Sequence, residues 1–285
     1  MECAIESRLL CASYRGENLV HYSSKFKFKR VESGDLKRSI YRLRYQIYVE
    51  EFGFERPEDH SNGLEKDQYD PYSVYVVALN GADEVIGTAR LVLHSEHGFP
   101  IEHTGCTLQY PGEKPRPECI AEVSRLAIAP AYRRRADDDQ YGVESYSKVG
   151  ERDVLPDSGS IPTHFARRQR PVIVLGLVGL LWHTSRSLGL THWYMIAEQK
   201  LWPVMYRFGL LFHQIGEPVD YHGIRVPYMA SLAESEAHLK HTNPSLYDMF
   251  LHGLELQSHP EMIPVLAHKY TYAGSKLATH LVSGQ

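Results

Sequence analysis

The sequence predicts a mixed α/β fold in which helices flank a central, mostly antiparallel sheet. Three observations support this prediction. Two apolar runs are joined by Asn80-Gly81, an apolar strand pattern covers 120–128, and apolar residues recur at helical spacing on both sides of these strands. Asn-Gly between apolar runs is the strongest short-range hairpin signal, and alternating helices and strands favour a layered α/β architecture.

The elements are expected in the following order along the chain. The patterns indicate a short strand at 26–31, a helix at 36–52, hairpin strands at 73–79 and 84–93, and the central strand at 120–128. They then indicate a helix from Pro171 to Gly189, a strand at 192–197, a helix at 198–208, and antiparallel strands at 210–215 and 224–232. Asp35 is the candidate N-cap of the first helix, and Gly53 ends it. The carboxylate-rich stretch 55–70 is either a functional loop or a solvated acidic surface loop.

A chain of 285 residues is long enough for one large domain with a buried core. We expect a main domain at 1–232, interrupted by a polar, Asp-rich insertion at about 136–165. Residues 233–285 are expected to form a helical C-terminal extension that packs on the same domain.

Composition narrows the class of protein. A formal net charge of -4 gives no reason to expect a nucleic-acid partner. The four cysteines have no paired spacing, so we expect reduced thiols, a cytoplasmic location and no metal site. The first residues lack a sustained apolar run, and the apolar run 172–182 is too short to span a membrane.

The central strand combines burial with charge. Glu122 and Arg125 interrupt its apolar pattern, and buried charges cost several kcal/mol unless they are paired or used. The strand is followed by an Ala-Pro break and then by Arg133, Arg134 and Arg135, which suit an anionic ligand. Glu122 is therefore a candidate catalytic base, or else one half of a structural ion pair with Arg125 or Arg90.

Several motifs resemble a known family. The segments LRYQIYVEEFGFE (43–55), KDQYD (66–70), VIGTARL (85–91) and AEVSRL (121–126) occur in an order similar to that of autoinducer (acyl-homoserine-lactone) synthases and N-acyl amino acid synthases. LWPVMYRFGL (201–210) resembles the late helix of the wider GNAT acyltransferase fold. Phe54 departs from the synthases, which usually place Trp there. The insertion and the C-terminal extension look more like acyltransferases associated with exosortase/PEP-CTERM export systems.

The resemblance implies a GNAT-fold N-acyltransferase. Its substrates would be an acyl-phosphopantetheine donor, carried by acyl carrier protein or coenzyme A, and a small-molecule amine acceptor, with no metal required. Glu122 would act as the base or orient the acceptor. Tyr206 would protonate the leaving thiolate, unless it only packs in the core. The implied substrate-binding residues are Arg44, Phe54, Asp67, Asp70, Arg90, Ser124 and Arg125.

Arginines on both sides of the insertion form the dense basic patch of the sequence. These residues, which would bind the acyl donor or its carrier protein, are Arg133, Arg134, Arg135, Arg167, Arg168 and Arg170. An acidic carrier protein suits such a surface. The alternative is a solvated charge run balanced by the aspartates at 137–139.

Two other functions are consistent with the same residues. One is an acetyl-CoA-dependent acetyltransferase, which a profile of donor chain lengths would identify. The other is a catalytically silent module that binds acyl carrier protein or a partner in an export system. An intact set of Glu122, Arg90 and Arg125 argues against the silent module.

Overall fold

The computed structural model describes residues 19–23, 26–31, 34–133, 169–244, 246–247 and 250. The predicted insertion at about 136–165 lies outside these residues. Of the predicted C-terminal extension, the structure describes helix α6 (Leu232–Thr242) and a few residues after it. The predicted division into domains therefore stays a prediction.

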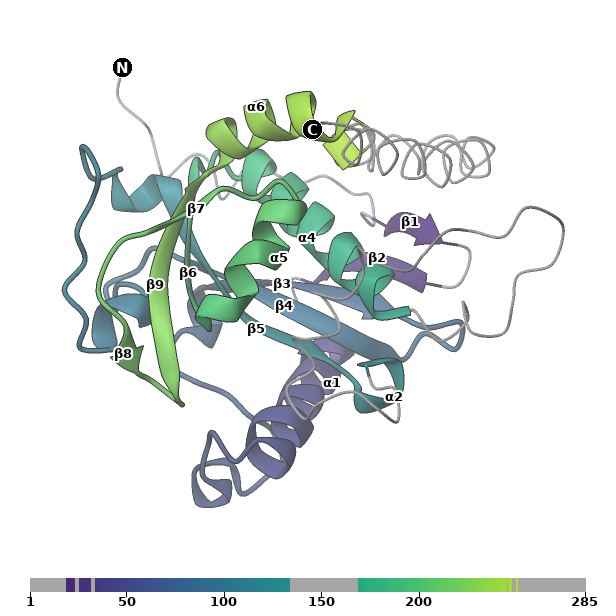
Figure 1. The fold of residues 1–285 in the computed structure, drawn as a ribbon. Helices are drawn as coiled ribbons and strands as arrows, with labels where there is room; N and C mark the ends of the chain where they lie inside the picture. The colour runs from purple at the N-terminus through teal and green to yellow at the C-terminus, as the bar shows by residue number, and fades with distance from the viewer. Residues whose placement is uncertain are drawn as a thin grey trace, which may run out of the picture.

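A single sheet is the framework of the described chain. Its strand order is β1-β2-β3-β4-β5-β6-β9-β7, and β8 pairs with β9 (Figure 1). Neighbouring strands are antiparallel except β5 and β6, which run parallel. This confirms the predicted mixed α/β fold with a mostly antiparallel sheet. The strands are β1 (Leu19–Ser23), β2 (Phe26–Val31), β3 (Ser73–Leu79), β4 (Val85–Leu93), β5 (Ile120–Ile128), β6 (His192–Ala197), β7 (Phe212–Gln214), β8 (Val219–Asp220) and β9 (Ile224–Ser231).

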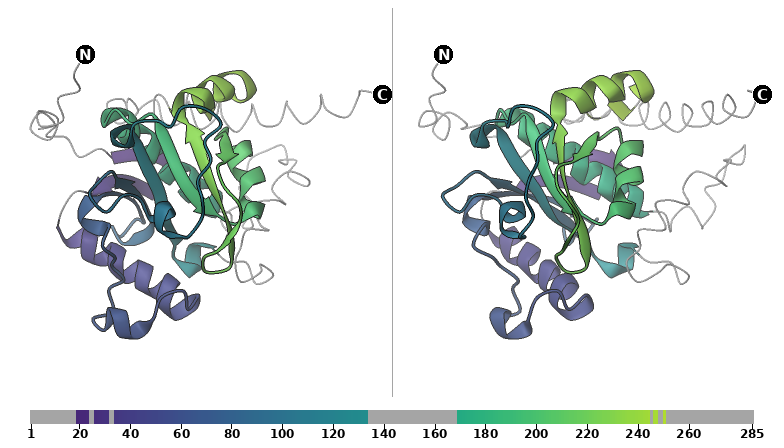
Figure 2. Two further views of the ribbon diagram at one scale, coloured as in Figure 1. Left: turned by 90° about the vertical axis from the view of Figure 1, so that its left-hand side faces the viewer. Right: turned by 60° about the vertical axis from the view of Figure 1, so that its left-hand side comes forward.

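Helices cover both faces of the sheet. Helix α1 lies on one face, and α4 and α5 lie on the other (Figures 1 and 2). None of the helices in the described ranges is both long and apolar enough to cross a membrane. Besides α6, the α-helices of the described residues are α1 (Asp35–Arg44), the four-residue α2 (Pro130–Arg133), α4 (Gln169–Ser187) and α5 (Trp202–Arg207).

Alternation along the strands assigns each side chain to one face. On β3, Val76 and Ala78 pack in the large core cluster that includes Leu177 of α4. Tyr75 and Val77, the residues between them, pack in a second cluster with Ile40 of α1. Because side chains point alternately to the two faces of a sheet, the strands supply two separate sets of groups. One set faces α4, and the other faces α1.

The structure corrects several local predictions. Asp35 is the first residue of α1 rather than its cap, because Gly34 occupies the N-cap position. The predicted first helix changes character at Tyr45, where a π-helical segment runs to Glu51. The helix predicted at 198–208 is a 3-10 turn followed by the short α5. Strands β1 and β8 were not predicted, and β7 is shorter than the predicted 210–215.

Two irregularities open the middle of the sheet. Strand β5 pairs with β6 only from Ile120 to Glu122, although both strands continue beyond that point. On its other edge, the register between β5 and β4 shifts at a bulge, where Arg125 has a left-handed φ of 49°. A bulge bends its strand and disrupts the ladder locally. Strands β5 and β6 therefore separate after Glu122.

Candidate active site

A cavity of about 280 Å³ lies where β5 and β6 separate. Residues Val123–Leu126 of β5 and Met195–Ala197 of β6 line it. Glu122 and Ser124 lie opposite β4 residues whose side chains point away from α4, so they face the α1 side of the sheet. Val123 packs against the core cluster on the α4 side. The lining therefore comes from both faces of the sheet, and the cavity reaches through the sheet at the split.

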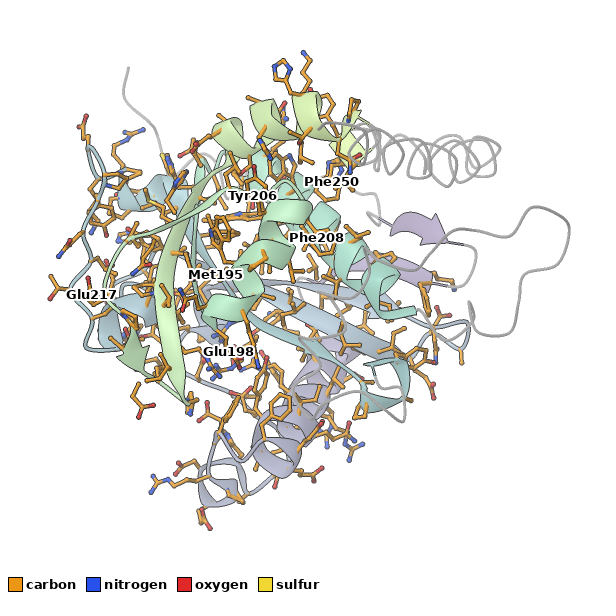
Figure 3. All side chains as sticks on the ribbon, in the orientation of Figure 1. Met195, Glu198, Tyr206, Phe208, Glu217 and Phe250 are labelled. Carbon is orange, nitrogen blue, oxygen red and sulfur yellow. The ribbon has the colours of Figure 1, made fainter. Side chains whose placement is uncertain are left out.

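The α4 side of the cavity is apolar. Figure 3 labels Met195, which lies on β6 in the middle of the molecule. No charged side chain interrupts this part of the described lining. The residues that make it up are Val178, Leu181, Trp193, Met195, Leu201, Met205, Leu210 and Phe212.

On the α1 side, buried arginines bind the carboxylates of the loop 55–70. Arg44 is fully buried on α1, and it donates to Glu65 and, over 2.8 Å, to Oδ1 of Asp70. Arg90 of β4 donates to the same Asp70 oxygen over 2.6 Å and to Asp67 over 2.7 Å. The structure thus brings together Arg44, Asp67, Asp70 and Arg90, which were predicted as substrate-binding residues. Only Asp67 and Arg90 of these four line the cavity, and the predicted role of the set stays a prediction. The part of the loop from Glu65 to Asp70 is therefore held by buried ion pairs, whereas Glu58 and Asp59 are exposed.

Two predicted binding residues on β5, Ser124 and Arg125, belong to the same network. Arg90 Nε donates to Ser124 Oγ over 3.0 Å, directly across the β4–β5 ladder. Arg125 is 14% exposed and donates to Glu55 over 2.9 Å and to Glu65 over 3.1 Å. Asp67 lies 3.5 Å from the same Arg125 nitrogen. Arg125 therefore has three carboxylate neighbours.

The arginines keep these carboxylates ionised. Burial alone raises the pKa of Asp70, but the Arg44 and Arg90 guanidinium groups outweigh burial and lower it to about 2. Burial is likewise outweighed at Glu65 and Asp67, whose pKa values are lowered chiefly by Arg125 and Arg90 respectively. Glu65, Asp67 and Asp70 are therefore ionised at neutral pH.

Glu122 differs from these carboxylates. It is buried at the point where β5 and β6 separate, and it lines the cavity. Burial raises the pKa of Glu122 to about 8, and the hydrogen bond from the Ile101 backbone N–H only partly opposes this effect. Among the described residues, no arginine forms an ion pair with Glu122, so the predicted alternative of a structural pair with Arg125 or Arg90 is wrong. Near neutral pH, Glu122 is suited to exchange a proton.

Tyr206 lies away from the cavity. It is 46% exposed on α5, and its ring stacks on Trp202 at a centroid distance of 5.5 Å. Figure 3 shows it at the end of α5 nearer α6, where its ring also contacts His238. The structure therefore does not bring Tyr206 to Glu122, and the predicted alternative of core packing does not describe it either.

The predicted basic patch falls mostly outside what the structure describes. Arg134, Arg135, Arg167 and Arg168 lie outside the described residues. Arg133 ends α2 and Arg170 lies in the first turn of α4, but their side chains are not described. Their predicted role toward the acyl donor stays a prediction.

Sequence reasoning missed several residues at this site. Glu65 is the fully buried partner of both Arg44 and Arg125, yet it looks like any other carboxylate of a polar loop. Tyr75 was predicted only as a strand residue, and its hydroxyl donates to Asp70. The predicted Phe54 does line the cavity, but it stacks on His222 at a centroid distance of 5.2 Å. His222 belongs to the β8–β9 turn, which lies between the predicted strands 210–215 and 224–232.

Residues 43–140 match the model of the acetyltransferase (GNAT) domain. This stretch contains β3, β4 and β5, and with them Glu122 and the whole arginine–carboxylate network. The predicted GNAT fold is thus confirmed for the stretch that carries the site. The search of curated proteins gave no match.

Solved structures give more distant likenesses. TofI, in a ternary complex with an inhibitor and MTA, is 20% identical and has a TM-score of 0.49, covering 77% of this chain and 98% of that chain. The CoA-dependent acyl-homoserine lactone synthase BjaI, with SAM and isopentyl-CoA, is 19% identical at a TM-score of 0.45, covering 71% and 80%. FeeM, an N-acyl amino acid synthase from uncultured soil microbes, is 13% identical at a TM-score of 0.44, covering 75% and 94%. At this distance, the likenesses carry no argument about substrates.

Proposed function

We propose that this protein is an N-acyltransferase. It moves a medium or long acyl chain from an acyl carrier protein thioester, or from acyl-CoA, to the amine of an amino acid or a similar small molecule. One observation supports this proposal most directly. The cavity passes through the split between β5 and β6, with Glu122 at the crossing, an apolar lining on one side and charged groups on the other.

The acyl donor occupies the split and the apolar side. Where β5 and β6 no longer pair, their facing edges have backbone groups available to an extended phosphopantetheine arm, in the manner of an added strand. The acyl chain then lies among Val178, Leu181 and Met205. An acetyl group needs far less apolar surface than this lining offers, which favours a longer chain over the acetyl-CoA alternative.

Glu122 moves the proton in this scheme. The free amine attacks the thioester carbonyl, so that a C–N bond forms and the C–S bond breaks. The proton that nitrogen loses passes to Glu122, which returns it to the leaving sulfur. A group with a pKa of about 8 is well matched to a thiol, whose ordinary value is about 8.5. Glu122 thereby performs the proton delivery first assigned to Tyr206.

The bulge supplies the remaining requirement, which is stabilisation of the oxyanion. Val123, Ser124, Arg125 and Leu126 all line the cavity, and the backbone ladder to β4 is interrupted at this point. A backbone N–H at the bulge donates to the carbonyl oxygen as it becomes negatively charged. The arginine–carboxylate network holds this backbone and the loop 55–70 in place.

The experiment is a turnover assay with purified chain. Acyl-CoA and acyl carrier protein thioesters from two to sixteen carbons are offered with the twenty standard amino acids. Release of free thiol and mass spectrometry of the products report the reaction. We expect N-acyl products from the longer donors, and a loss of about 100-fold or more in Glu122→Gln. The matched control is Glu58→Gln, an exposed carboxylate outside the cavity, which should retain wild-type turnover.

Each alternative function predicts a different result. Turnover confined to the two-carbon donor would identify an acetyltransferase. Donor binding without turnover of any acceptor would identify the catalytically silent module. Full activity in Glu122→Gln would contradict the role given to Glu122.

A further inference from the structure

The β8–β9 turn brings a further set of side chains to the charged side of the cavity. Tyr221, His222 and Arg225 all line it. Their backbone supports this placement, because His222 and Gly223 both have left-handed φ values, of 53° and 90°. A Cβ at Gly223 would lie 3.3 Å from an Arg225 guanidinium nitrogen, so a larger residue there would crowd Arg225. None of these residues has a part in the chemistry described above.

Arg225 is held from two sides within this set. Its Nη2 nitrogen lies 3.3 Å from Oε1 of Glu198, the residue that follows β6 (Figure 3). Its central carbon lies 5.9 Å from the centre of the Phe54 ring, which in turn stacks on His222. A ring face attracts a guanidinium group and orients it without taking up its N–H donors. Arg225 is therefore fixed in position and 15% exposed.

The cavity's two partly exposed arginines differ in how far they are neutralised. Arg125 has three carboxylates within 3.5 Å, namely Glu55, Glu65 and Asp67. Arg225 has one within the described residues, and Glu198 places its other oxygen against Lys200. A guanidinium carries five N–H donors in a planar fork that fits a carboxylate. Arg225 also donates from Nη1 to the backbone carbonyl of Ile224 over 3.2 Å. It keeps positive charge and further N–H donors for a bound anion, whereas the charge of Arg125 is matched by three carboxylates.

We infer that Arg225, oriented by Phe54, binds the carboxylate of the acyl acceptor, so that the acceptor is an amino acid with a free α-carboxylate. This inference rests on the proposed function and specifies its acceptor. The other charge of such a molecule also has partners. Glu55 and Asp67 line the same side of the cavity and are partly exposed, so they complement an ammonium group.

The test compares acceptors that differ only at the carboxylate. The amino acid that wild-type protein acylates fastest is compared with its amide and with its decarboxylated amine. We expect kcat/KM to be about 10- to 100-fold higher for the amino acid than for either analogue. Equal rates for all three would overturn the inference and leave the proposed function standing. No acylation of any amine would instead remove the proposed function.

Variants then assign the preference to Arg225. In Arg225→Gln we expect KM for the amino acid to rise about 10-fold or more, with little change in kcat or in the kinetics of the amide. Arg225→Lys should recover part of the preference, because the charge remains while the planar fork is lost. Arg56→Gln is the matched control, since Arg56 is exposed and lies outside the cavity lining. An equal loss for amino acid and amide in Arg225→Gln would mean a purely structural role and would overturn the assignment.

Discussion

Ile101 donates its backbone N–H to Oε2 of Glu122 over 2.8 Å. The donor belongs to a 3-10 turn (Pro100–His103), and the acceptor lies on β5 at the last residue that pairs with β6. This hydrogen bond fixes the position of a buried carboxyl group at the cavity wall. Among the described residues, the second carboxyl oxygen has no hydrogen-bond partner, so it is available to a substrate.

The raised pKa of Glu122 predicts a pH-dependent stability. Its pKa is about 8 in the folded chain and about 4.5 when unfolded, so the folded state retains the proton between these values. The stabilisation from the neutral carboxyl is complete below pH 4.5 and is lost as pH rises through 8. Glu122→Gln has no carboxyl group to ionise and lacks this loss. Between pH 5 and pH 9, the melting temperature of wild type should therefore fall by on the order of 5 °C more than that of Glu122→Gln. Thermal unfolding between pH 5 and 9 measures this, and parallel curves for the two proteins would contradict it.

The buried network predicts a large cost for removing one partner. Arg44→Met leaves Glu65 and Asp70 with one fewer cation in a buried setting, which should cost about 3 to 5 kcal/mol of unfolding free energy. Urea unfolding measures this cost, and Arg44→Lys should recover part of it. The exposed pair between Lys27 and Asp83 is the control, and Lys27→Met should cost less than about 1 kcal/mol. Similar costs for Arg44→Met and Lys27→Met would show that the network contributes nothing beyond a surface pair.

Gly176 predicts a steric limit on the packing of α4 against β2. Alanine is usually the better helix former, but a Cβ at Gly176 would lie 2.2 Å from the ring of the fully buried Phe28. Gly176→Ala should therefore destabilise the fold by about 1 to 3 kcal/mol. Adding Phe28→Leu should return part of that free energy in a double-mutant cycle. If the two changes in unfolding free energy are additive, the Phe28 ring and the added methyl group are not in contact.

The position of Tyr206 predicts that its hydroxyl is dispensable. Tyr206→Phe keeps the ring that stacks on Trp202 and removes only an exposed hydroxyl outside the cavity lining. We expect kcat/KM for acyl transfer to stay within about twofold of wild type. A loss above about tenfold would restore Tyr206 as the proton donor.

The fold could be predicted from the sequence wherever local pattern and turn chemistry agreed. Strands β3 and β4 have apolar runs, and Asn80-Gly81 lies between them. Gly53, Gly189 and Gly209 follow helical segments with left-handed φ values of 63°, 69° and 71°, as their positions suggested. The π-helical segment at Tyr45–Glu51 was not predicted, because a run of seven residues is too short to distinguish the i to i+5 spacing of a π-helix from the spacing of an α-helix.

The candidate site could be predicted in part. Arg44, Asp67, Asp70 and Arg90 came from motif resemblance, and the structure brings them together. Glu65 could not be identified, because its partners Arg44 and Arg125 lie 21 and 60 positions away in the chain. The contribution of the β8–β9 turn was equally hidden, since it depends on how two distant segments meet around Phe54.

The split between β5 and β6 has a kinetic consequence. Because the lining of the cavity comes from both faces of the sheet, the proposed donor and acceptor would bind on different sides and would not compete for one position. In the proposed reaction we therefore expect direct transfer within a ternary complex, without a covalent acyl-enzyme, and initial-rate plots for the two substrates should intersect rather than run parallel. At low concentrations the rate depends on the product of both substrate levels. The proposed reaction would therefore be fast only when the acyl donor and the free amine are abundant at the same time.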